Sequence, residues 1–190
     1  MLRNAWRSVR LGVLIFSLLP PTATAADQPA TDTLLEARPD PDGGVRAHAV
    51  MTLPASAAAV EQLLTDYEHW PKLFETKMRM VKVERLEDRT ITDLYVSHAI
   101  LLSERHLVGE NRVLPDGGLS TKMIGGDFTR YERTWKLSAL DPTHTRAEFD
   151  LLVEVDTFVP DWLVAMEVKR ELAAHFRILK ATLQDQPGAH

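Results

Sequence analysis

One short segment places a charged side chain among large apolar ones, two residues apart. Tyr131, Arg133, Trp135 and Leu137 alternate with Glu, Thr and Lys, so in a β-strand they share one face. If that face looks inward, Arg133 must be paired or must bind an anion or carbonyl, because an unpaired buried charge is costly. The indole of Trp135 favours the inward orientation; the outward one leaves Arg133 solvated. Two partners for an inward Arg133 stay open: the polar head of a bound molecule, or a buried Glu or Asp.

Other residue types with catalytic chemistry form no recognisable motif. The chain has no cysteine, which excludes thiolate nucleophiles and thiolate metal sites. It has no Gly-x-Ser-x-Gly motif, and Gly125-Gly126-Asp127 lacks the spacing and the lysine of a phosphate-binding loop. We therefore assign no catalytic residue. An acid–base pair would need inward-facing titratable groups, for which the candidates are Asp93, Tyr95, His98 and Arg133.

The histidines predict no metal site. None shows the i, i+4 spacing of a helical site or a His-Glu-x-x-His pattern. His98 and His106 lie on neighbouring predicted strands across a turn and can approach each other, but two ligands without a third are not a zinc site. Glu167, Arg170 and Glu171, with Lys169, are interpreted as the solvated face of the final helix. No metal and no cofactor are expected.

The first 25 residues have the pattern of a secretory signal peptide. Arg3, Arg7 and Arg10 precede an apolar stretch from Leu11 to Leu19, and Ala23-Thr24-Ala25 is a small-x-small cleavage site. The apolar stretch is shorter than the ~20 residues that span a bilayer, although an uncleaved anchor is the alternative. We expect cleavage near Ala25 and a periplasmic or secreted protein without a stable membrane anchor.

The charge balance argues against nucleic-acid partners. The chain carries 22 basic and 27 acidic side chains. Loss of the three arginines before residue 25 changes the net charge from −5 to −8, because residues 1–25 contain no acid. Phosphate backbones are bound mainly by Lys and Arg, so neither nucleic acid nor an anionic membrane surface is an expected partner. A protein partner is not identified by the sequence.

The remaining sequence predicts one α+β domain over residues 45–184, followed by a tail at 185–190. Residues 26–44 are either a linker or a short strand that turns through Pro39–Gly44, since Asp-Gly and Gly-Gly favour hairpins. Val45–Leu53 reads as a strand, and Pro54 and Ser56 introduce a helix. Pro71 either ends this helix or forces a second short one through Lys72-Leu73-Phe74. Alternation with period two then predicts six antiparallel strands: Met78–Leu86, Thr90–Leu101, Glu104–Leu114, Leu119–Ile124, Arg130–Leu140 and Arg146–Asp156.

A long amphipathic helix closes the domain. Pro160 opens it, and its apolar seam consists of Val164, Val168, Leu172, Phe176, Leu179 and Leu183. A curved sheet of about six to seven strands must bury one face, and this helix is the element that can cover it. Such a sheet does not always close fully around one helix, which leaves an apolar cavity able to bind a small molecule.

The candidate cavity residues are mostly aromatic, methionine and aliphatic side chains. Tyr67, Trp70 and Phe74 lie where the first helix breaks, and they either cap the cavity or pack that break onto the sheet. Methionines suit a pliable lining but are also ordinary core residues. The remaining candidates are Met78, Met80, Tyr95, Met123, Phe128, Tyr131, Arg133, Trp135, Phe149, Leu151, Val153, Trp162 and Met166.

The chain resembles the helix-grip START and polyketide-cyclase-like superfamily, and within it the coenzyme-Q-binding branch and its exported members. The resemblance covers about residues 45–183. It rests on Leu53-Pro54-Ala55-Ser56, Leu64-Thr65-Asp66-Tyr67-Glu68-His69-Trp70-Pro71 with Phe74, Gly126-Asp127-Phe128 with Trp135, Thr145-Arg146, and Pro160. The Asp-Tyr-x-x-Trp-Pro segment is the most specific of these. The resemblance implies the fold, whereas the superfamily hosts lipid carriers, quinone binders, receptors and a few enzymes.

These observations favour a carrier of an apolar small molecule, such as a lipid, a quinone or a polyketide-like compound. An enzyme of the cyclase, dehydratase or hydrolase type that uses the same cavity is the first alternative. A module that binds another envelope protein is the second, and it predicts a contiguous exposed apolar patch.

Overall fold

The computed structural model describes residues 33–98 and 103–185. The elements follow in this order: β1 (Thr33–Pro39), β2 (Val45–Leu53), α1 (Ala57–Thr65), the 3-10 helix η1 (Tyr67–Leu73), β3 (Lys77–Arg85), β4 (Thr90–Ser97), β5 (Arg105–Val113), β6 (Gly118–Gly126), β7 (Phe128–Asp141), β8 (His144–Val155) and α2 (Asp161–Gln184). The predicted signal peptide, the end of the predicted strand Thr90–Leu101, and the tail after residue 185 lie outside the described residues.

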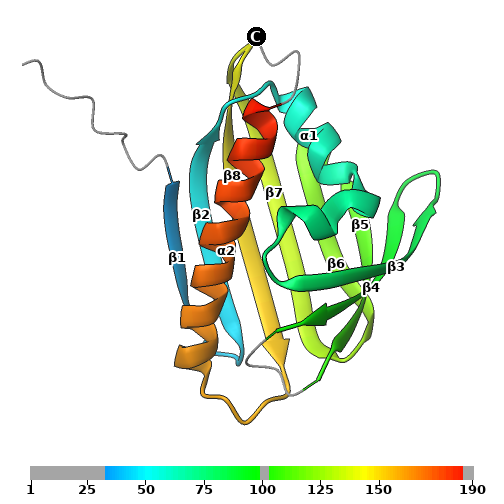
Figure 1. The fold of residues 1–190 in the computed structure, drawn as a ribbon, viewed down its shortest axis with the longest axis vertical. Coiled ribbons are helices and arrows are strands. Elements are labelled where there is room, and N and C mark those ends of the chain that lie inside the picture. Colours follow the sequence, from blue (N-terminus) through cyan, green and yellow to red (C-terminus); the bar gives the residue numbers. More distant parts are fainter. Residues whose placement is uncertain (1–32, 99–102, 186–190) are drawn as a thin grey trace, which may run out of the picture. The chain divides into compact units, whose positions relative to one another are not determined.

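The strands form one curved antiparallel sheet in the order β1-β2-β8-β7-β6-β5-β4-β3 (Figure 1). The α+β fold class is therefore confirmed, but the sheet described here has eight strands rather than six to seven. Each consecutive pair from β3 to β8 is joined by a short connection, which gives the predicted meander. Strand β2 pairs with β8 and thereby brings the N-terminal strands onto the end of the meander.

The additional strand is β1, which resolves the choice between linker and strand for its residues. β1 pairs with β2 in register from Thr33 opposite Met51 to Pro39 opposite Val45. In the turn, the backbone N–H of Asp40 donates to Gly44 at 2.9 Å. Gly43 and Gly44 have φ angles of 97° and 78°, which side chains other than glycine rarely adopt. The two glycines thus let this chain make a tight hairpin.

Helix α2 lies across the inner face of the sheet and packs on β1 and β2 (Figure 1). Its predicted seam is buried or partly buried along its whole length. Phe176 packs edge-on against Trp135 and Phe149, with ring centroids 5.7 and 5.3 Å apart. Among the described residues no helix is both long and apolar enough to cross a membrane.

The first helix, α1, is followed directly by the aromatic segment of η1. The Ser56 hydroxyl accepts from the backbone N–H of Ala59 at 3.3 Å and caps the N-terminus of α1. Pro71 does not end the helical path at once but lies inside η1. The indole of Trp70 donates to the carbonyl of Leu64 at 2.9 Å, which fixes this ring under the helix break.

Candidate functional site

A cavity lies between α2 and the part of the sheet that this helix does not cover. The volume of the cavity is about 190 Å³. Strands β3 to β8, η1 and α2 all contribute to its wall, and most of the lining side chains are apolar. The wall consists of Trp70, Phe74, Thr76, Met78, Thr92, Leu94, Val96, His98, Leu107, Thr121, Phe128, Tyr131, Arg133, Leu151, Val153, Val155, Val164, Glu167, Val168, Glu171 and Leu172.

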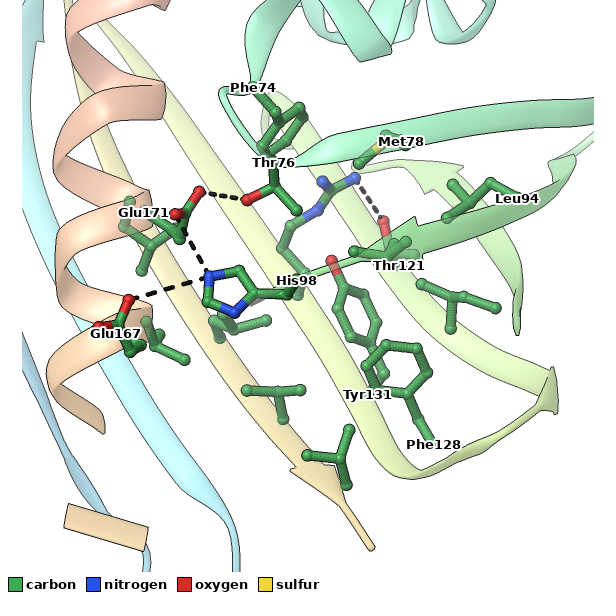
Figure 2. Close-up of a pocket in the computed structure, with 18 of the residues that line it drawn as sticks. Phe74, Thr76, Met78, Leu94, His98, Thr121, Phe128, Tyr131, Glu167 and Glu171 are labelled. Carbon is green, nitrogen blue, oxygen red and sulfur yellow. Dashed lines mark hydrogen bonds and ion pairs between the residues drawn. The ribbon is translucent and has the colours of Figure 1, made fainter. Parts of the chain in front are cut away.

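Half of the candidate residues lie on this wall. Figure 2 shows Phe74 and Met78 on one side of the cavity and Tyr131 and Phe128 on another. The structure thus brings together residues from η1, β3, β7 and β8 that are far apart in the sequence. The candidates on the wall are Trp70, Phe74, Met78, Phe128, Tyr131, Arg133, Leu151 and Val153.

Other candidates face inward but belong to the solid core. Trp135 and Phe149 are each 1% exposed and contact each other with ring centroids 4.7 Å apart, at the part of the sheet covered by α2. Tyr67 is buried edge-on against Trp70, away from the cavity wall. Met80 and Met123 are partly buried against the core and do not line the cavity.

Three further candidates point away from the cavity. Thr92, Leu94 and Val96 line it, so the alternation along β4 turns Tyr95 to the opposite face. There Tyr95 stacks on His106 at 4.8 Å and contacts the guanidinium of Arg79.

Trp162 and Met166 lie on the exposed side of α2, 63% and 54% exposed. They do so because the helix turns Val164 and Val168 toward the cavity instead.

Arg133 does face inward, as the neighbouring indole indicated. Its side chain is only 8% exposed, and one guanidinium nitrogen donates to the Thr121 hydroxyl at 3.1 Å. The guanidinium carbon lies 4.3 Å from the centre of the Trp70 ring. The Nε atom is buried without a hydrogen-bond partner among the described residues. Of the two partners left open, a buried Glu or Asp is not found in the part of the chain that the structure describes.

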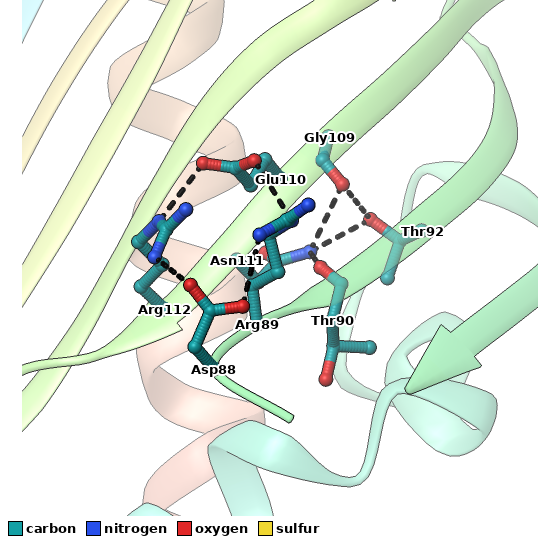
Figure 3. Close-up of polar contacts among 8 residues, drawn as sticks. All are labelled: Asp88, Arg89, Thr90, Thr92, Gly109, Glu110, Asn111 and Arg112. Atoms are coloured by element: carbon teal, nitrogen blue, oxygen red, sulfur yellow. Dashed lines mark hydrogen bonds and ion pairs between the residues drawn. The ribbon is translucent and has the colours of Figure 1, made fainter. Parts of the chain in front are cut away.

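A buried polar network that includes Thr92 and Thr121 of the wall fixes this arginine. Figure 3 shows one end of it, where the side-chain N–H groups of Asn111 face the carbonyls of Thr90 and Gly109 and the hydroxyl of Thr92. The Asn111 oxygen therefore accepts from the Thr121 hydroxyl, at 2.8 Å. The Thr121 oxygen is left to accept from Arg133. The hydrogen-bond direction in the network is thus set before any ligand arrives.

A second polar group lies on the opposite wall, where Figure 2 shows His98 beside α2. Its Nε2 lies 3.3 Å from Glu171 Oε1 and 3.9 Å from Glu167 Oε2. The Thr76 hydroxyl donates to the other oxygen of Glu171, and Arg170 contacts both carboxylates. Such a group can exchange protons, and its three ligating atoms, all within 4.8 Å of one another, could hold a cation.

The sequence does not predict this group. The helical pattern assigns Glu167 and Glu171 to the solvated face of the helix, yet both line the cavity. The available signal was their position, since they lie three residues after Val164 and Val168 on the apolar seam. The approach of His98 to His106 is not observed: His106 Nε2 lies 2.8 Å from Asp93 on the other face of the sheet.

A buried histidine beside the cavity wall carries no charge at neutral pH. His175 is 3% exposed, its ring stacks on Phe74 at 4.1 Å, and its Nδ1–H donates to the Leu73 carbonyl at 2.8 Å. Burial lowers the pKa of His175 to about 4, the hydrogen bond to Leu73 opposes this shift, and the charge of Arg133 adds to it. His175 therefore adds no second positive charge next to Arg133.

The fold agrees with comparisons to known proteins. The chain belongs to the family described as polyketide cyclase / dehydrase and lipid transport, whose model matches residues 53–176, more than half of the chain. The predicted superfamily is therefore confirmed, while membership of the coenzyme-Q-binding branch stays a prediction. No curated protein matches the sequence.

Solved structures with the same fold come from bacteria and humans. The STAR-related lipid transfer protein from Xanthomonas axonopodis is 15% identical with a TM-score of 0.65, and the match covers 83% of this chain and 97% of that one. Human STARD10 is 10% identical with a TM-score of 0.67, covering 83% and 71%. The Zhui aromatase/cyclase from Streptomyces sp. R1128 is 13% identical with a TM-score of 0.57, covering 78% and 94%. At these identities the likeness shows the fold alone.

Proposed function

We propose that this protein binds and carries an apolar small molecule, a lipid, quinone or polyketide-like compound, outside the cytoplasm. The observation that carries the proposal is the mostly apolar cavity between α2 and the sheet. The family description and the similar structures named as lipid transfer proteins support it. The signal-peptide pattern of residues 1–25 supports the location.

The mechanism of binding is burial. Each 100 Å² of apolar surface removed from water contributes about 2.5 kcal/mol. The wall offers Leu94, Val96, Leu107, Leu151 and Val153 for this purpose. A few polar groups then orient the molecule, as is usual in small-molecule sites.

A variant that fills the cavity should lose its ligand. We expect native mass spectrometry of protein from its native compartment to show a co-purifying apolar compound on a chain that begins after residue 25. Val96→Trp places a large side chain in the cavity, and we expect at least a tenfold drop in the bound fraction. Trp is well tolerated in strands, so the fold should persist.

The matched control is Val113→Trp, because Val113 lies on β5 and is 54% exposed. This variant should keep the compound at the wild-type level. A wild-type spectrum that is identical before and after delipidation would refute the proposal.

The contact between His98 and Glu171 favours an enzyme as the second candidate. An imidazole and a carboxylate 3.3 Å apart on a cavity wall can pass a proton to or from a bound molecule. Incubating the co-purified compound with delipidated protein tests this alternative. Conversion by wild-type protein that is lost in His98→Gln would favour an enzyme; an unchanged compound in both would favour the carrier.

A further inference from the structure

No carboxylate among the described residues pairs with Arg133. Its side chain is more than nine-tenths buried and lines the cavity. Among the described residues, only the neutral Thr121 hydroxyl accepts from it, and Nε has no hydrogen-bond partner. A buried cation without a counterion is unfavourable. A ligand group that supplies negative charge here therefore binds much more favourably than a neutral group.

The surroundings hold the guanidinium in place instead of neutralising it. Trp70 supports one face of the guanidinium, and a cation over an indole ring is favourable but leaves the charge in place. The hydrogen bonds from Arg133 to Thr121 and from Thr121 to Asn111 fix one edge of the guanidinium. The arginine is therefore preorganised, and a ligand pays little to order it.

The opposite wall carries two carboxylates that share one arginine, Arg170. Glu167 and Glu171 line the cavity from α2, across from the strands that carry Arg133 and Thr121 (Figure 2). An anion is repelled on the α2 side and attracted on the strand side. The cavity thus favours one orientation of an amphiphile, with its anionic end toward β7.

We propose that the ligand is an amphiphile with a single carboxylate head, which pairs with Arg133. This inference rests on the proposed function. A carboxylate matches the planar donors of one guanidinium and neutralises one charge. A phosphate would bring surplus charge and more oxygens than these few donors satisfy, and a carbonyl would leave Arg133 uncompensated.

Decanoate and 1-decanol, which share the same chain length, form the test pair. Binding to delipidated protein is measured by displacement of the neutral fluorophore N-phenyl-1-naphthylamine at pH 7.5. A hydrogen bond to a charged partner contributes enough for about a 10- to 100-fold preference. We expect wild-type protein to bind decanoate more tightly than decanol by that factor.

Arg133→Met should remove this preference while it keeps decanol binding within about threefold, since Met keeps the apolar length of the side chain. Arg133→Lys should keep part of the preference. Arg146→Met is the matched control, because Arg146 is exposed and pairs with Glu148; both affinities should stay at wild-type values.

The outcomes separate the two proposals. Equal affinities of wild-type protein for decanoate and decanol would overturn the carboxylate head and leave the carrier intact. This comparison needs no variant, so it holds even if Arg133→Met fails to fold. A preference that persists in a folded Arg133→Met also overturns the inference. Failure to bind either probe, with no co-purifying compound, would instead overturn the carrier.

Discussion

Replacing Trp135 with alanine should lower the free energy of unfolding by about 3–5 kcal/mol. Trp135 is 1% exposed and contacts Phe149 and Phe176 edge-on. Its loss leaves a hole among three elements, β7, β8 and α2, that cannot all collapse inward. For a domain of this size the midpoint of thermal unfolding should fall by roughly 6–20 °C. Urea titration and calorimetry measure both quantities.

The matched control is Trp162→Ala, which deletes the same side chain from the exposed side of α2. It should change stability by no more than about 0.5 kcal/mol. A similar loss for both variants would show that Trp135 is not part of a tightly packed core. It would also weaken the distinction between solid core and cavity.

The strands were predictable because alternation and turn chemistry are local. Period-two alternation predicts β8 closely, and Gly43-Gly44 allows the hairpin that makes β1 a strand. The apolar seam of α2 was equally predictable, because a continuous apolar stripe on a helix must be buried and the inner face of the sheet is the large surface available to bury it. These features need no knowledge of what lies opposite them.

The position of a residue along an inward face was not predictable. Tyr131, Arg133 and Trp135 share one face of β7, as the spacing indicates. The first two line the cavity, whereas Trp135 lies in the solid core. Alternation with period two shows which side chains share the inward face of a strand, but it does not show where α2 crosses that face. The position of this crossing decides whether a residue lies in the cavity wall or in the solid core.

The cluster on α2 shows the same limit for polar residues. His98 follows β4, and its partner Glu171 is 73 residues later in the chain. Nothing local distinguishes Glu171 from a solvated helix residue until the sheet is placed against it. The strand β4 also has two candidate faces, and the cavity candidate Tyr95 lies on the face that points away from the cavity.

Lowering the pH should destabilise the fold through His175 well before most carboxylates titrate. Burial lowers the pKa of His175 to about 4 in the folded protein, whereas an unfolded histidine titrates near 6.5. Between these values the unfolded state binds a proton that the folded state does not. The free energy of unfolding therefore rises with pH in this window. As the pH falls from 7 to 4, it decreases by roughly 3 kcal/mol.

Urea unfolding at several pH values between 7 and 4.5 measures this loss, and His175→Asn isolates it. The asparagine amide nitrogen occupies the position of Nδ1, so it can still donate to the Leu73 carbonyl that His175 contacts, but it does not titrate. The variant should be less stable than wild type at pH 7, because the stacking on Phe74 is lost, and its stability should fall less steeply with acid. The carboxylates are common to both proteins, so the difference between the two curves reports His175 alone. Parallel curves would mean that His175 takes up a proton as readily in the folded protein as in the unfolded chain. That result would contradict the claim that burial lowers the pKa of His175.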